Sequence, residues 1–148
     1  MSIPPSQLSA TPRRRLAVLS CMDARVNVEN VLGLATGDAH VIRNAGGIVT
    51  DDVIRSLAIS QRALGTVSIM VVQHSDCAMT RISDEELTAE LIADVGQQPP
   101  WAVGGFGNLD ASVRDSVHQL SRSPFLPNIE DIRGFVYELA SGDLREIT

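Results

Sequence analysis

Short apolar runs recur along the chain and are separated by amphipathic or turn-forming segments. Residues 16–20, 39–43, 67–72 and 134–138 are runs of this kind, and each predicts a β-strand. Residues 67–72 are almost wholly apolar, which is typical of a strand buried on both faces in the interior of a parallel sheet. Residues 141–143 predict a turn, and residues 144–148 predict a short antiparallel edge strand after it.

Helical spacing of apolar residues separates these strands. Thr50 predicts the cap of a helix that has acids in its first turn and ends near Gly65. Ser83 and Glu86 have the spacing of a capping box, which predicts a second helix that stops at Gly96. Residues 27–32 predict a helical turn, residues 97–107 a loop, and residues 109–120 a further helix.

This alternation predicts an α/β fold. We expect a mostly parallel central sheet of about four strands with a C-terminal antiparallel edge strand, flanked by helices. Residues 1–14 are polar and contain proline, so we expect an extended N-terminal arm, of a type that often reaches a partner subunit, followed by a single domain over residues 15–148. The ligand site of such a sheet lies beyond the carboxyl ends of its strands.

Composition narrows the function classes. The 148 residues carry a formal net charge of -6, which gives no electrostatic reason to bind nucleic acid or an anionic membrane surface. All 12 basic residues are arginine, so a lysine nucleophile is excluded. No apolar stretch approaches the roughly 20 residues that span a bilayer, and no signal-peptide core is present, so we expect a cytoplasmic protein. Its two cysteines are then metal ligands, catalytic thiols or core residues.

The position of the reactive residues favours a metal site. Cys21 ends the first predicted strand, and His74 and Cys77 follow the third, so all three fall at carboxyl ends that meet at one edge of a parallel sheet. Two thiolates and one imidazole leave the fourth tetrahedral position of Zn²⁺ open, as in catalytic zinc sites. Two thiolates also neutralise the ion, so we expect activity shifted toward alkaline pH.

Asp23 lies two residues after Cys21 and Arg25 lies two residues after Asp23, so the two side chains can pair with each other. An Asp23 held by Arg25 stays ionised and can accept a hydrogen bond from zinc-bound water. If Arg25 releases it, Asp23 can itself close the zinc site. A thiol redox enzyme is the less favoured class, because the chain has no Cys-x-x-Cys pair.

The segments Cys21-x-Asp23-x-Arg25, Arg43-Asn44-Ala45-Gly46 and His74-x-x-Cys77 together resemble β-class carbonic anhydrases in order and spacing. The resemblance implies Zn²⁺ on Cys21, His74 and Cys77, an Asp23–Arg25 dyad, and reversible hydration of carbon dioxide to bicarbonate by a zinc-bound hydroxide. It also implies a lyase that assembles as a homodimer or homotetramer.

Two alternatives stay open. Carbonyl sulfide and carbon disulfide hydrolases resemble the same family and share its metal ligands, and a catalytically weak zinc-binding assembly protein would have the site closed by Asp23. Ala78 is relevant to the second, because family members commonly have glycine there. A methyl group at that position is strained if the backbone has positive φ and harmless if it is helical or extended.

Overall fold

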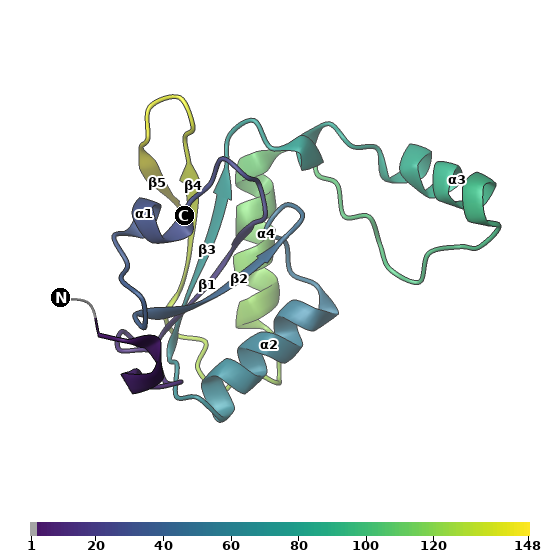
Figure 1. Ribbon diagram of the computed structural model, residues 1–148. Helices are drawn as coiled ribbons and strands as arrows, with labels where there is room; N and C mark the ends of the chain where they lie inside the picture. Colours follow the sequence, from purple (N-terminus) through teal and green to yellow (C-terminus); the bar gives the residue numbers. More distant parts are fainter. Residues whose placement is uncertain (1–2) are drawn as a thin grey trace.

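The computed structural model describes residues 3–148 and contains one five-stranded sheet (Figure 1). The strand order is β2-β1-β3-β4-β5, in which β1 to β4 run parallel and β5 pairs antiparallel with β4. The strands are β1 (Leu16–Cys21), β2 (Ala39–Asn44), β3 (Ser68–His74), β4 (Ile132–Tyr137) and β5 (Leu144–Ile147). The predicted α/β class, with a mostly parallel sheet and an antiparallel edge, is confirmed.

Four α-helices connect these strands: α1 (Val28–Leu32), α2 (Asp51–Arg62), α3 (Asp84–Val95) and α4 (Leu109–Ser121). Each begins at a polar residue whose side chain accepts a hydrogen bond from the backbone of the first turn, and these caps are Asn27, Thr50, Ser83 and Asn108. The sequence predicted two of the caps, Thr50 and Ser83. Short 3-10 turns at Pro5–Gln7 and Ala78–Thr80 were not predicted.

Two aliphatic clusters hold the sheet between its covering layers. On one face, α2 and α4 pack on a fully buried group that includes Leu19, Leu57 and Leu120. On the other face, α1 and the residues around it cover Val18 and Val72. Burial of each large aliphatic side chain contributes about 1.5–3 kcal/mol, so these clusters supply most of the free energy that holds the strand ends in register.

The segment before β1 runs along its own chain. The ring nitrogen Nε2 of His40 bonds the Ala10 carbonyl at 2.8 Å, and the backbone N–H groups of Arg13 and Arg14 donate to the carbonyls of Gly37 and Asp38 at 2.9 and 3.1 Å. Arg13 also pairs with the Asp38 carboxylate at 2.9 Å. Residues 10–14 are therefore tied to the start of β2 in the same protomer, and Pro5–Gln7 form a 3-10 turn before them.

Both ends of strand β3 differ from the sequence prediction, and the later end lies in the functional region. Strand β3 begins at Ser68 and extends to His74, so this histidine is the last residue of the strand and does not follow it. Hydrogen bonds to β4 continue that far, since His74 pairs with Tyr137 in the register. The last two residues, Gln73 and His74, are polar, and an apolar run alone could not include them.

Helix α3 stands away from the rest of the molecule at the end of two long connecting segments (Figure 1). None of its residues is buried. Within residues 3–148, none of the helices has both the length and the apolar character needed to cross a bilayer.

Candidate metal centre

Adjacent parallel strands bring three candidate ligands together. Strands β1 and β3 are neighbours, and Ser20 pairs with Val72. Cys21 lies one residue beyond this pair on β1, and His74 lies two residues beyond it on β3. The chain then turns back through Cys77, which caps the 3-10 turn at Ala78–Thr80. One ligand atom from each of Cys21, His74 and Cys77 lies within 4.8 Å of the others, and all three residues are buried.

The imidazole of His74 is oriented for coordination. Its Nδ1 lies 2.7 Å from the Ser75 carbonyl oxygen, which can only accept, so Nδ1 carries the proton. Nε2 is then left with a free lone pair, and it is buried without any hydrogen-bond partner. A buried acceptor without a partner is costly in a folded protein, and a metal ion bonded to Nε2 removes that cost.

The two thiols differ in acidity. Burial alone raises the pKa of Cys21, but without a metal a protonated His74 ring donates to the thiolate, and together with the backbone N–H groups of Asp23 and Gly46 it brings that pKa down to about 7. Burial raises the pKa of Cys77, and the negative charge of a Cys21 thiolate raises it further. A bound dication stabilises both thiolates, since the thiolate is the form that coordinates metal.

Arg25 holds Asp23 with two parallel hydrogen bonds. Its Nε donates to Oδ1 at 3.0 Å and its Nη2 donates to Oδ2 at 2.8 Å, while the Arg25 backbone N–H donates to Oδ1 at 2.8 Å. These bonds hold the pKa of Asp23 well below its usual range, so the carboxylate is ionised at neutral pH. Asp23 Oδ2 lies 3.6 Å from His74 Nε2, which places the carboxylate at the edge of the ligand cluster.

Asp76 is a member of this site that sequence reasoning missed. Its carboxylate accepts from Arg25 Nη1 at 2.8 Å and from Arg81 Nη1 at 2.8 Å, and its carbonyl accepts from Arg25 Nη2 at 3.0 Å. These arginines lower the pKa of Asp76. Asp76 has a positive φ of 55°, which is uncommon for a residue with a side chain. The available signal was its position inside the His74-x-x-Cys77 loop of a chain whose only basic residues are arginines.

The end of β2 and the loop after it support the first candidate ligand from behind. Arg43 donates to the carbonyls of Cys21 and Asp23, both at 2.8 Å, so it fixes the backbone on both sides of Met22. Gly47 has a φ of +63°, and a Cβ there would lie 2.9 Å from the backbone nitrogen of Cys21. Both contacts place this part of the chain directly behind Cys21.

Ala78 does not crowd the site. It is exposed, and its backbone lies in a 3-10 turn without positive φ. The harmless alternative for this position is therefore the one that the structure shows.

The donor set fits a single divalent ion. Zinc bonds thiolate sulfur at about 2.3 Å and imidazole nitrogen at about 2.0–2.1 Å, and three donor atoms within 4.8 Å of one another can converge on such an ion. The unpartnered Nε2 of His74 and the acidified Cys21 thiol favour occupancy. An α/β sheet that gathers two thiols and an imidazole at the ends of neighbouring strands has the donors of a metalloprotein site, in which three side chains could hold one ion.

Comparison with known proteins identifies the family. The sequence model described as carbonic anhydrase matches residues 16–98. The chain is 43% identical to Beta-carbonic anhydrase 1 of Mycobacterium tuberculosis (strain ATCC 25618 / H37Rv) over 141 residues, which cover 95% of this chain and 86% of the relative. The chain therefore belongs to the β-carbonic anhydrase family, whose members are metalloenzymes.

A solved structure and a second relative extend the comparison. The carbonic anhydrase of Streptococcus mutans superposes with a TM-score of 0.88 at 42% identity, covering 95% of this chain and 86% of that chain. The carbon disulfide hydrolase of Acidianus sp. (strain A1-3) is 37% identical over 157 residues, covering 90% of this chain and 77% of the relative. The chain is therefore similar to proteins named for two different reactions.

We expect Gly47→Ala to destabilise the protein more than Gly33→Ala. Gly33 has nearly the same positive φ, 65°, but a Cβ there would meet nothing within 4 Å. Gly33→Ala isolates the cost of the left-handed backbone, about 1–2 kcal/mol, and the clash with the Cys21 backbone adds about 1–3 kcal/mol at Gly47. Urea unfolding followed by circular dichroism measures both variants, and equal free energies of unfolding would contradict the proposed support of Cys21 by this loop.

Proposed function

We propose that this protein is a zinc enzyme that catalyses the reversible hydration of carbon dioxide to bicarbonate. The observation that carries the proposal is the convergence of Cys21, His74 and Cys77, with the His74 Nε2 lone pair buried and unpartnered. The 43% identity to a β-carbonic anhydrase over nearly the whole chain supports the same reaction.

The residues proposed to hold Zn²⁺ are Cys21, His74 and Cys77, and the fourth position of the ion would be left to solvent or substrate. When bound, zinc would supply a Lewis acid that lowers the pKa of water, less strongly with two thiolate ligands than with neutral ones, and so provides a nucleophile for carbon dioxide at alkaline pH. Ser75 fixes the tautomer of His74 through its carbonyl, which keeps Nε2 aimed at the ligand cluster.

Asp23 and Arg25 are proposed as the catalytic pair. Asp23 is an ionised acceptor 3.6 Å from His74 Nε2, so it can accept a hydrogen bond from a water molecule at the open position and orient it. Arg25 positions Asp23 through both carboxylate oxygens, and Asp76 in turn positions Arg25.

The hydrogen bonds of Arg25 argue against a site closed by Asp23. Coordination by Asp23 would compete with the two charge-assisted bonds that its carboxylate accepts from a guanidinium, and that guanidinium is itself fixed by Asp76. The structure therefore supports an open, catalytic site over a catalytically weak assembly protein.

Hydrolysis of carbonyl sulfide or carbon disulfide is the second candidate, because the Acidianus relative is named carbon disulfide hydrolase. These molecules are small linear electrophiles like carbon dioxide. The higher identity to the mycobacterial β-carbonic anhydrase favours carbon dioxide.

We also propose a homo-oligomer, a homodimer or homotetramer, in the cytoplasm. Large apolar side chains such as Val95, Trp101 and Phe125 are 60–62% exposed, and self-association would cover surface of this kind. Cys21 and Cys77 must stay reduced to bind metal, which suits a reducing compartment.

We expect His74→Ala to lose the metal. The purified wild-type protein should contain about one zinc per chain, and removal of the only nitrogen donor should reduce this at least tenfold. Plasma mass spectrometry measures the zinc content. His118→Ala, the same change at an exposed histidine of α4, is the matched control and should retain full zinc. Full occupancy in His74→Ala would refute the proposed ligand set.

The wild-type protein should hydrate carbon dioxide faster than it releases hydrogen sulfide from carbonyl sulfide or carbon disulfide. Stopped-flow hydration with a pH indicator, run beside a sulfide-release assay between about pH 7 and pH 9, compares the substrates and covers the expected alkaline range. A higher kcat/KM for either sulfur compound would assign the protein to the second candidate function.

Asp23→Asn should retain zinc but lose turnover by about 100-fold or more, because the amide replaces an ionised acceptor with a group that also donates. The measurements are carbon dioxide hydration and zinc content on the same preparation. The control is Asp110→Asn, which changes a carboxylate of α4 that pairs with Arg145 of β5, and it should leave turnover unchanged. Unaltered turnover in Asp23→Asn would remove Asp23 from the mechanism.

A further inference from the structure

Gln73 is a buried amide on an otherwise apolar face of β3. It is 0% exposed, and it alternates along the strand with Ile69 and Val71, which belong to the aliphatic cluster beneath α2 and α4. Its side-chain oxygen Oε1 has no hydrogen-bond partner, and within residues 3–148 the other buried side-chain atom in this situation is Nε2 of His74. The two unpartnered atoms therefore belong to consecutive residues at the end of one strand.

The unpartnered oxygen makes this amide costly for folding. A buried acceptor without a partner gives up its hydrogen bonds to water and gains none in return. Methionine has nearly the same length as glutamine and carries no group of this kind, so packing alone favours an apolar side chain at this position. What the amide supplies instead is the N–H donor of its side-chain nitrogen.

The side-chain nitrogen of Gln73 holds the turn that lies against Cys21. Its Nε2 donates to the Gly47 carbonyl at 3.3 Å in a buried hydrogen bond. Gly47 packs closely on the first strand, since a Cβ there would lie 2.9 Å from the Cys21 backbone nitrogen. The N–H of the preceding residue, Gly46, donates to the Cys21 sulfur. Gln73 therefore bonds the turn one residue away from the N–H group that contacts the sulfur.

A second amide holds the same turn from the other side of Cys21. Cys21 pairs with Asn44 in the β1–β2 register, and extending the β1–β3 register by one residue sets it beside Gln73. The Asn44 side chain donates to the Ile48 carbonyl at 2.9 Å and accepts from the Ile48 N–H at 3.1 Å. Cys21 is thus flanked by an amide on each neighbouring strand, and both amides bind the backbone of residues 47–48.

We propose that Gln73 is a positioning residue of the metal centre, which acts on Cys21 through the turn at residues 45–48. The inference rests on the proposed metal function of Cys21, and it adds a residue whose side chain bonds the turn and none of the three candidate ligands. A turn held by Gln73 keeps the Gly46 N–H directed at the Cys21 sulfur, and a hydrogen bond to a ligand atom orients that ligand toward its metal. Without this amide, the only side chain bonded to the backbone of residues 47–48 is that of Asn44, and a bound ion leaves more readily.

Release of zinc to a colorimetric chelator tests this role. Gln73→Met keeps the length of the side chain and removes its N–H donor. We expect the variant to bind zinc but to release it roughly tenfold faster than the wild type. Its urea midpoint without metal should be unchanged or higher, because the unpartnered oxygen is removed together with the donor. Release at the wild-type rate would overturn the proposal.

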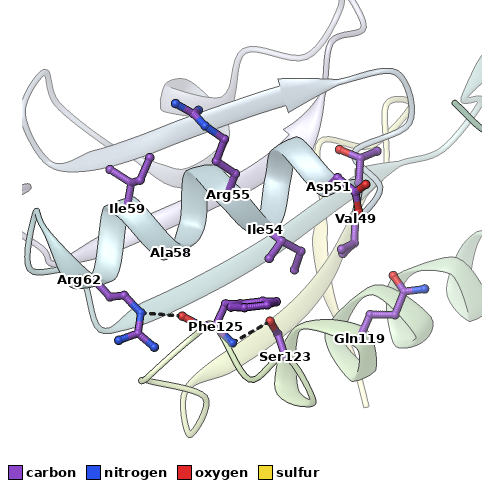
Figure 2. Close-up of a pocket in the computed structure, with 11 residues that line it drawn as sticks. Val49, Asp51, Ile54, Arg55, Ala58, Ile59, Arg62, Gln119, Ser123 and Phe125 are labelled. Carbon is purple, nitrogen blue, oxygen red and sulfur yellow. Dashed lines mark hydrogen bonds between the residues drawn. The ribbon is translucent and has the colours of Figure 1, made fainter. Parts of the chain in front are cut away.

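Gln61→Met is the matched control. Figure 2 shows the end of α2 that carries Gln61, next to Arg62, which donates to the Phe125 carbonyl at 2.9 Å. Gln61 is also buried, and its amide makes two bonds to the backbone of Asn128, at 2.9 and 3.0 Å. Because both ends of this amide are paired, the control should unfold at lower urea but release zinc at the wild-type rate. Equal acceleration in both variants would refute the role of Gln73.

Hydrogen exchange of the Gly46 amide proton locates the effect in the turn. Measured by NMR on zinc-bound, ¹⁵N-labelled protein, this proton should exchange roughly tenfold faster in Gln73→Met than in the wild type, because one contact that closes the turn is lost. The amide proton of Leu19, in the centre of β1, should exchange at the same rate in both proteins. Unchanged exchange at Gly46 would contradict the proposed route from Gln73 to Cys21.

Both measurements need a bound metal ion but no turnover, which separates this inference from the proposed reaction. A wild type that binds zinc without hydrating carbon dioxide would count against the proposed function alone. Zinc release and Gly46 exchange that do not differ between the wild type and Gln73→Met would count against the role of Gln73 alone. A wild type that takes up no zinc would remove the ligand set and this inference with it.

Discussion

The pairing of β1 with β3 is the constraint on which the site depends. These strands are neighbours in space although about fifty residues separate them in the sequence, and their register sets Ser20 beside Val72. Cys21 and His74 follow at the common carboxyl edge, so the sheet holds the first two candidate ligands in place before any loop contributes. The aliphatic clusters on both faces stabilise that register, because a slip of one residue would turn every buried side chain to the opposite face.

A second constraint on the site is the set of hydrogen bonds that the guanidinium of Arg25 donates. Arg25 donates to both oxygens of Asp23 and to the carboxylate and carbonyl of Asp76, and so joins the loop after β1 to the loop after β3. An ammonium could not satisfy this planar arrangement, and the chain contains no lysine. The same contacts keep Asp23 ionised and hold it beside the ligand cluster, so the orientation of the carboxylate is built into the fold.

Local patterns predicted the sheet, most of the helices and the residues that converge, because apolar periodicity and caps are properties of short segments. Asp76 could not be predicted in this way, since its role depends on a positive φ and on arginines 51 residues before and five residues after it. Periodicity also could not show that α3 would have no core of its own. The contacts of residues 10–14 with the start of β2 were missed because they combine backbone hydrogen bonds with side-chain contacts between residues about 25 positions apart or more, and neither leaves a local pattern in the sequence.

The two sides of the metal centre differ in how they are supported. The floor, which contains Cys21 and His74, belongs to the buried sheet. The wall, which contains Met79 and Phe106, belongs to an excursion whose outer part buries no side chain in its own protomer. The order of this wall depends on the contacts at the far end of the excursion, because a segment with few buried contacts has a low free energy of local opening. The positions of Cys21 and His74 are therefore fixed by the sheet of one chain, whereas Met79 and Phe106 belong to a segment that has fewer buried contacts to fix it.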